Sequence, residues 1–159
     1  MMQDLDIELY YGGWAPGEEN NKIASYMSCN GSNINFDVLP ALDVDCYAQM
    51  YNHVDICLAP LYKDEFTQCK SELKALEAGF MNCALIASNQ IPFTYICNDK
   101  NSILVDKDGW YNAVKYLVEN KDKIKDLAKE LNKDVTEHYD ILKEAKKREE
   151  FYKELCKNL

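Results

Sequence analysis

The sequence predicts an α/β domain with a parallel sheet of about five or six strands, flanked by helices and followed by a helical C-terminal extension. Short apolar runs alternate with segments in which apolar residues recur every three or four positions, a pattern typical of strands separated by helices. One run, residues 54–61, is almost continuously apolar, as expected for a parallel strand covered on both faces. Strands joined through helices favour right-handed crossovers and therefore a parallel sheet.

Each expected element has a local reason in the sequence. Strands are expected at residues 4–11, 33–39, 54–61, 84–88 and 103–105, and helices at 18–29, 44–52, in the stretch before residue 84, at 92–97, 110–119, 121–132 and 140–159. Turn residues divide them, since Asn30-Gly31 closes the first helix and Pro40 stops the second strand. Asp43 is a good N-cap for the helix that begins at Val44, whose inward face would be formed by Tyr47, Met50 and Tyr51.

A glycine pair, Gly12-Gly13, follows the first strand directly. Glycine allows the backbone to approach a ligand closely, as it does in phosphate-binding turns. An ordinary tight turn explains glycine there equally well. Because the rest of a GxGxxG pattern is missing, the sequence leaves both interpretations open.

The stretch from Phe66 to Ser88 is the centre of the prediction. At helical period it carries an apolar stripe made of Cys69, Leu73, Leu76, Phe80 and Cys83. Their spacing by four and three predicts the buried face of a helix.

Charged residues lie about a quarter turn away from this stripe. Lys70 and Lys74 are four positions apart, so they should repel on a helix, and the positive end of the helix dipole disfavours them further. A phosphate bound by the free N–H groups of the helix, the Ser71 hydroxyl and both ammonium groups would resolve the conflict. The alternative is that both lysines point into water.

The pattern Lys70-Ser71-x-x-Lys74-x-x-Glu77, followed by the strand at 84–88, resembles the donor-site signature of GT-B glycosyltransferases of the large retaining family 4 type. Residues 54–61 and 108–110 are similar to flanking segments of that family, so that the resemblance spans about residues 5–155. It implies a single Rossmann-like, GT-B-type donor-binding domain over residues 1–159. The terminal helix, residues 138–159, would pack back on the domain or on a partner.

The resemblance also implies roles for individual residues. Lys74 and Lys70 would act as catalytic cations on the donor diphosphate, and Glu77 would hydrogen-bond the ribose. The remaining donor-binding positions are Gly12, Gly13, Leu39, Pro40 and Ser71, of which Leu39 and Pro40 lie where relatives hold the base. The implied activity is retaining, metal-independent hexosyl transfer from a nucleotide-diphosphate sugar, without a cofactor. The partner would be an acceptor domain on another chain, or a second copy bound through the C-terminal helix.

The chain departs from this family in three places. Many relatives carry a second glutamate eight positions before the ribose-binding one, where this chain has Cys69, which cannot accept hydrogen bonds in the same way. Asn82 and Ala84 replace the usual glycine and proline before the fourth strand, although Asn tolerates the left-handed geometry of a helix end. The acceptor domain is not within the 159 residues.

Composition and charge limit the function further. A net charge of −9 disfavours nonspecific binding to nucleic acid or anionic membranes. The seven cysteines form no CxxC pair and no zinc-ligand cluster, which predicts reduced, buried thiols and a cytoplasmic location. There is no signal-peptide pattern and no apolar run long enough for a transmembrane span.

Two motifs are interpreted as structural. The Asp-x-Asp sequences at 4–6 and 43–45 do not predict a metal site, because the carboxylates of a metal site must converge and Asp43 is explained as a helix cap. His53 and His138 have no nucleophile with an acidic partner around them.

Two other function classes stay open. The domain could be a non-catalytic binding or structural module derived from a glycosyltransferase, which Cys69 and the missing acceptor domain favour. A flavodoxin-like or receiver-like regulator is the third hypothesis, but the acidic phosphorylation pocket of a receiver is not found in the sequence.

Overall fold

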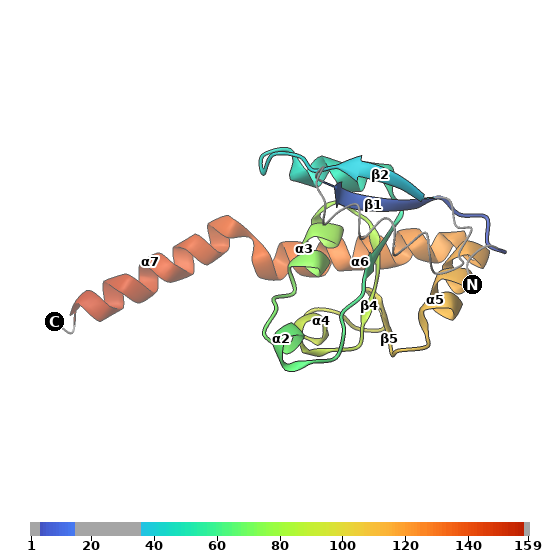
Figure 1. The fold of residues 1–159 in the computed structure, drawn as a ribbon. Helices are drawn as coiled ribbons and strands as arrows, with labels where there is room; N and C mark the ends of the chain where they lie inside the picture. Colours follow the sequence, from blue (N-terminus) through green and yellow to red (C-terminus); the bar gives the residue numbers. More distant parts are fainter. Residues whose placement is uncertain (1–3, 15–35, 158–159) are drawn as a thin grey trace.

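The structure is a computed structural model that describes residues 4–14 and 36–157. The helix predicted at 18–29 and the first residues of the second predicted strand lie outside the described residues, as does the end of the last helix. Within the described part, parallel strands are connected through helices, so the α/β class is confirmed (Figure 1).

The described strands form two parallel sheets. One has the order β3 (Ile56–Ala59), β4 (Ala84–Ser88), β5 (Ile103–Val105), and the other pairs β1 (Leu9–Trp14) with β2 (Phe36–Pro40). The parallel pairing was predicted, and β4 and β5 have the predicted bounds. A single sheet of five or six strands is not formed by the described residues.

The separation into two sheets is related to where strand hydrogen bonding begins in the N-terminal segment. The predicted strand at 4–11 starts five residues late, at Leu9. Leu5 and Ile7 pack instead, as side chains, against the apolar cluster of the three-stranded sheet. The N-terminal segment therefore contacts that sheet through side chains before it pairs with β2.

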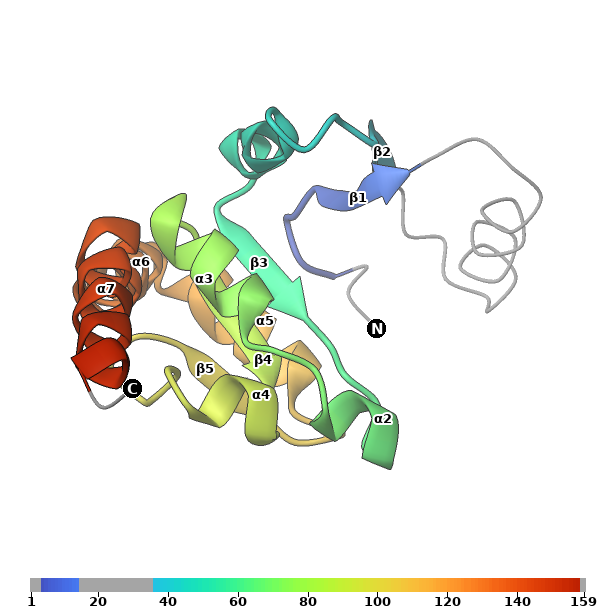
Figure 2. The same cartoon turned by 90° about the vertical axis from the view of Figure 1, so that its left-hand side faces the viewer.

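β4 is the central strand of the domain, and all five of its residues are buried. Because side chains alternate across a strand, Leu85 and Ala87 belong to the apolar cluster on one face, whereas Ala84 and Ile86 belong to the cluster on the other. The first face is covered by α3 (Leu73–Phe80) and α6 (Lys121–Tyr139), and the second by α5 (Trp110–Glu119) (Figure 2). This is the layering expected for a parallel sheet.

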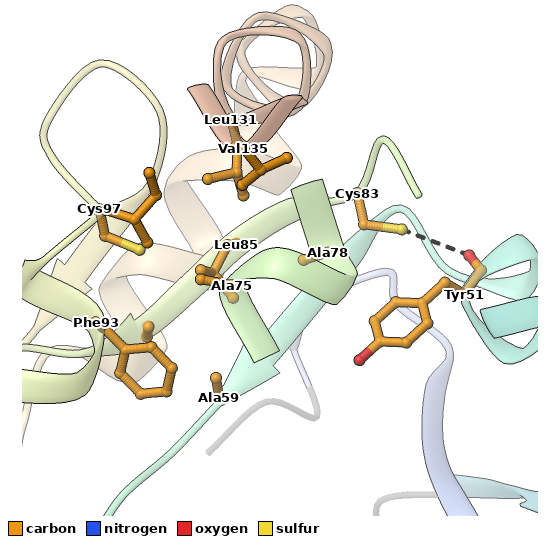
Figure 3. Close-up of a cluster of buried hydrophobic side chains, with 12 residues drawn as sticks. Tyr51, Ala59, Ala75, Ala78, Cys83, Leu85, Phe93, Cys97, Leu131 and Val135 are labelled. Carbon is orange, nitrogen blue, oxygen red and sulfur yellow. Dashed lines mark hydrogen bonds between the residues drawn. The ribbon is translucent and has the colours of Figure 1, made fainter. Parts of the chain in front are cut away.

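The buried face of α3 is made of small residues. Ala75, Ala78 and Gly79 are buried, and α3 packs closely on α6 through Leu131 and Val135 (Figure 3). The apolar stripe predicted from the sequence is wrong for three of its five members, since Cys69, Leu73 and Phe80 are exposed.

The stripe failed because the chain forms two helices where one was expected. α2 (Glu65–Gln68) begins at a capping box in which Asp64 Oδ1 accepts from the Thr67 N–H at 2.7 Å. Residues 69–72 then leave the helix, and α3 starts at Leu73 in a different phase. α3 ends at Phe80, and Asn82, two residues further on, has a φ of 55°, the left-handed geometry predicted for that position.

The C-terminal region is more helical and more extended than predicted. α6 continues beyond the predicted end at residue 132 to Tyr139, and its buried residues make it a core helix and not merely a solvated one. α7 (Ile141–Lys157) has no buried residue and projects away from the sheets, so it does not pack back on the domain. None of the described helices has the length and apolarity that would let it cross a membrane.

The remaining described elements are short. They are η1 (Tyr47–His53), a 3-10 helix, and α4 (Ile91–Thr94), which replaces the helical turn predicted at 92–97. The cysteines are less buried than predicted, because Cys46, Cys69 and Cys156 are exposed.

Candidate functional site

Lys74 and Glu77 lie side by side on α3. The Lys74 ammonium donates to Glu77 Oε2 at 2.7 Å, and the two residues are one helical turn apart. The Lys74 side chain is 46% exposed and the Glu77 side chain 18%, so the carboxylate is the more sheltered partner. The structure therefore joins the two residues that were predicted to contact the diphosphate and the ribose.

Two tyrosines from η1 complete a four-residue cluster, which we call the Lys74–Glu77 cluster. The Tyr51 hydroxyl donates to Glu77 Oε2 at 2.5 Å, and the Lys74 ammonium donates to the Tyr47 hydroxyl at 2.5 Å. The ammonium also lies 5.0 Å from the centre of the Tyr47 ring, within the range of a cation–π interaction. Both tyrosine roles were missed by the sequence analysis.

The sequence nevertheless contained part of this information. Tyr47, Met50 and Tyr51 were predicted to face inward, and Met50 and Tyr51 are buried while Tyr47 is half-buried. A buried tyrosine usually finds a hydrogen-bond partner for its hydroxyl, and this rule could have directed attention to a nearby carboxylate. The partner itself is 26 positions away in sequence and is brought close only by the fold.

Asp43 does not cap this helix. η1 begins three residues later than the predicted helix, its N-cap is Cys46, and no side chain caps it. Asp43 instead forms a turn through its backbone, because its carbonyl accepts from the Cys46 N–H at 2.9 Å.

The electrostatics favour the protonated forms of Lys74 and Tyr51. Burial lowers the pKa of Lys74, but the hydrogen bonds to Glu77 and Tyr47 outweigh burial, so that its pKa is raised and the ammonium form is favoured. Burial, followed by the hydrogen bond to Glu77, raises the pKa of Tyr51, which keeps its hydroxyl protonated as a donor. In the described part of the chain, no hydrogen bond reaches Glu77 Oε1.

The ends of β1 and β2 meet beside η1. Gly12 is opposite Leu39 and Trp14 opposite Pro40, with an irregularity in the register that contains Gly13. A Cβ atom built on Gly12 would lie 3.6 Å from Met50 Sδ, an ordinary contact distance. The predicted glycine turn is thus next to η1, whose Tyr47 and Tyr51 contact Lys74 and Glu77, and the predicted base-binding residues pair with the end of β1. The protein packing itself does not require glycine at position 12.

Lys70 and Ser71 lie outside the Lys74–Glu77 cluster. Both are exposed and precede α3, and the Lys70 ammonium is 5.3 Å from the centre of the Phe66 ring. Lys70 is therefore not on the same helix as Lys74, although the two are four positions apart in the sequence. The repulsion expected for two lysines on successive turns of one helix does not arise. No side chain caps α3, since its N-cap residue, Glu72, makes no capping hydrogen bond and accepts from the Tyr139 hydroxyl.

A second polar arrangement lies at the carboxyl ends of β3 and β4. Ser88 Oγ accepts from the Leu61 N–H at 2.8 Å, and Gln90 Nε2 donates to the Leu61 carbonyl at 2.8 Å. These bonds fix the loop after β3 to the end of β4. Gln90 Oε1 is buried and has no hydrogen-bond partner in the described part of the chain.

Among the described residues, no group of three or more His, Cys, Asp or Glu side chains is arranged to hold a metal ion. One surface hollow of about 560 Å³ lies beside the end of α6, and it contains none of the predicted site residues. Its lining residues are Tyr95, Ile96, Asn98, Asp134, His138 and Tyr139.

Comparison with protein-family models gives no match for this chain, and comparison with curated protein sequences gives none either.

Proposed function

We propose that this chain is the nucleotide-diphosphate-sugar binding domain of a retaining, metal-independent glycosyltransferase, which transfers a hexosyl group only together with an acceptor domain that the 159 residues lack. The observation that carries the proposal is the Lys74–Glu77 pair on α3, which is hydrogen-bonded to η1, the helix whose Met50 lies near Gly12 of β1. A cation suited to the diphosphate and a carboxylate suited to the ribose are thus adjacent on one helix. Gly12, a glycine that the packing around it does not require, lies near Met50 of η1.

The ion pair can open when a ligand enters, because the Lys74 side chain is 46% exposed and a phosphate offers two or more charged oxygens to the same ammonium. Lys74 would then turn to the diphosphate and stabilise the charge that develops on it as the sugar departs. The N–H groups at the start of α3, where no side chain caps the helix, would add hydrogen bonds to the same anion. Lys70 and Ser71 precede these N–H groups and are exposed to the same solvent.

We also propose that β1 and β2 belong with β3, β4 and β5 to one Rossmann-like arrangement. All described pairings are parallel, and Leu5 and Ile7 pack on the same apolar cluster as β3. Ligands of such sheets bind beyond the carboxyl ends of the strands, which is where Gly12 and the loop fixed by Ser88 lie.

A non-catalytic module derived from this enzyme class is the second candidate. The Lys74 ammonium and the Glu77 carboxylate neutralise each other, so their retention does not by itself require an anionic ligand. Cys69 is exposed and stands where many members of the family carry a second glutamate. A thiol cannot accept hydrogen bonds as a carboxylate does, which favours a pocket that binds a nucleotide without turnover.

Calorimetric titration with UDP, GDP and their sugar conjugates separates the two candidates. For a donor site we expect micromolar binding, weakened by about tenfold or more in Lys74→Ala and Glu77→Gln, because each variant loses a charged hydrogen bond to the ligand. Lys123→Ala is the matched control, since Lys123 forms an exposed pair with Asp126 at the same helical spacing on α6. Absence of heat with every nucleotide would exclude the donor site and leave the module.

A further inference from the structure

We infer that Tyr51 is a positioning residue of the candidate site, which holds Glu77 so that only its Oε1 atom is presented to the two ribose hydroxyls of a bound nucleotide. This inference rests on the proposed function and adds to it the part of the protein that makes the site selective for ribonucleotides.

Tyr51 is held at both ends. Its backbone carbonyl accepts a hydrogen bond from the Cys83 thiol, at 3.5 Å, and Cys83 lies in the turn between α3 and β4 (Figure 3). Its hydroxyl reaches back to Glu77 on α3. The side chain between these two anchors is only 8% exposed, so it has little freedom to adopt another position.

The hydrogen bonds to Glu77 are unevenly distributed between its two oxygens. Oε2 accepts from both the Tyr51 hydroxyl and the Lys74 ammonium, and in the described residues Oε1 accepts from neither these nor other groups. A carboxylate with one oxygen fully bound is fixed in rotation and offers the lone pairs of the other to a ligand. When Lys74 moves to a phosphate, Tyr51 is the donor that stays.

Tyr47 has a separate role, because it contacts Lys74 and not Glu77. The Lys74 ammonium is hydrogen-bonded to the Tyr47 hydroxyl and lies over the Tyr47 ring. The two tyrosines are themselves in edge-to-face contact, with ring centres 6.5 Å apart. Tyr47 therefore keeps the ammonium within reach of the site before the diphosphate binds, whereas Tyr51 determines where the carboxylate points.

The experiment compares two ligands that differ only in the ribose. The probes are UDP or GDP, whichever binds the wild-type chain more tightly, and the 2′,3′-dideoxy form of the same nucleotide. The dissociation constants of both are measured calorimetrically for the wild type, Tyr51→Phe and Glu77→Gln. Tyr139→Phe is the matched control, since the Tyr139 hydroxyl also donates to a glutamate, Glu72, at 2.6 Å.

We expect the wild type to prefer the ribonucleotide by about tenfold or more, as is usual for hydrogen bonds to a charged group. In Tyr51→Phe and Glu77→Gln the preference should fall to about threefold or less, because the loss of affinity is larger for the ribonucleotide than for the dideoxy nucleotide. Tyr139→Phe should keep the wild-type ratio. If Tyr51 had only a structural role, Tyr51→Phe would weaken the binding of both nucleotides equally and leave the ratio of their dissociation constants unchanged.

Two results overturn the inference and differ from failure of the proposed function. One is a wild-type chain that binds both nucleotides equally. The other is a Tyr51→Phe variant that retains the preference while Glu77→Gln loses it. If the wild type binds neither nucleotide, the proposed function itself has failed, and the positioning role fails with it.

Discussion

Gly79→Ala tests whether the close approach of α3 and α6 controls the stability of the domain. A Cβ atom at this position would lie 2.8 and 2.9 Å from the two Val135 methyl carbons and 3.1 Å from Leu131 Cγ. Both neighbours are fully buried, and the β-branched valine has little rotamer freedom in a helix. Asn132 Nδ2 also donates to the Gly79 carbonyl at 2.9 Å, which holds the two helices at this distance.

Two effects of opposite sign compete in this substitution. Alanine is the better helix former by about 1 kcal/mol. Overpacking of a filled core costs about 1–3 kcal/mol, and contacts below 3 Å place this site in the upper part of that range. We therefore expect Gly79→Ala to lower the free energy of unfolding by about 1–2 kcal/mol, measured by urea denaturation followed by circular dichroism.

The same substitution in a Val135→Ala background separates the clash from helix propensity. Removal of both methyl groups of Val135 costs roughly 1.5–3 kcal/mol alone, but it opens the space that the new Cβ atom needs. In the Val135→Ala background, Gly79→Ala should leave the free energy of unfolding unchanged or raise it by up to about 1 kcal/mol. Asn112→Ala controls for helix propensity, because Asn112 is exposed on α5. It should raise the free energy of unfolding by about 0.5 kcal/mol. Equal stabilisation by Gly79→Ala in both backgrounds would refute the reasoning.

Two further predictions concern titrating groups. Burial, with the hydrogen bond to Glu72, raises the pKa of Tyr139 to about 12, so the folded state holds this proton more tightly than the unfolded state, where the pKa is about 10. Its contribution to stability should be complete below pH 10 and be lost as the pH rises to 12. Tyr139→Phe should reduce the alkaline loss of unfolding free energy over that interval, and an identical loss in both proteins would contradict this. Burial also raises the pKa of three thiols to about 11, which suppresses their thiolate forms. At pH 8, site-resolved mass spectrometry after alkylation should show fast reaction at the exposed Cys46, Cys69 and Cys156, slower reaction at the partly buried Cys57, and reaction at the buried Cys83 and Cys97 only on unfolding. Rapid labelling of Cys83 and Cys97 in the native state would be evidence against their burial.

The fold was predictable from the sequence where apolar runs are short and bounded by turns. β4 and β5 were placed correctly because their residues form short apolar runs whose ends are marked by the turns around them. The arrangement of the strands in two sheets could not be predicted, because it depends on whether β1 pairs with β2 alone or also with β3.

The buried face of α3 was mispredicted for a different reason. Hydrophobic periodicity gives weight to large side chains such as Leu73 and Phe80, which are exposed, and little to Ala75, Ala78 and Gly79, which are buried. Close helix packing selects small residues, and their contribution becomes visible only when the partner helix is known.

The candidate site was predicted in part. The sequence pattern predicts Lys74 and Glu77 as site residues, and the structure brings them into contact. Lys70 was placed with them by a continuous helix that the chain does not form. The tyrosines of η1 were recognised only as inward-facing, because sequence spacing carries no information on which side chains meet between separate elements.

α7 depends for its order on interactions within itself. Asp140 Oδ1 accepts from the Leu142 and Lys143 N–H groups, and two exposed ion pairs, Lys147–Glu144 and Lys153–Glu149, link successive turns. In proteins most helical stability comes from the packing of an apolar face, and no residue of α7 is buried. A surface that covers Ile141 and Tyr152 would stabilise the helix by burying its apolar side chains. Docking of α7 and the folding stability of α7 are therefore coupled in a single equilibrium.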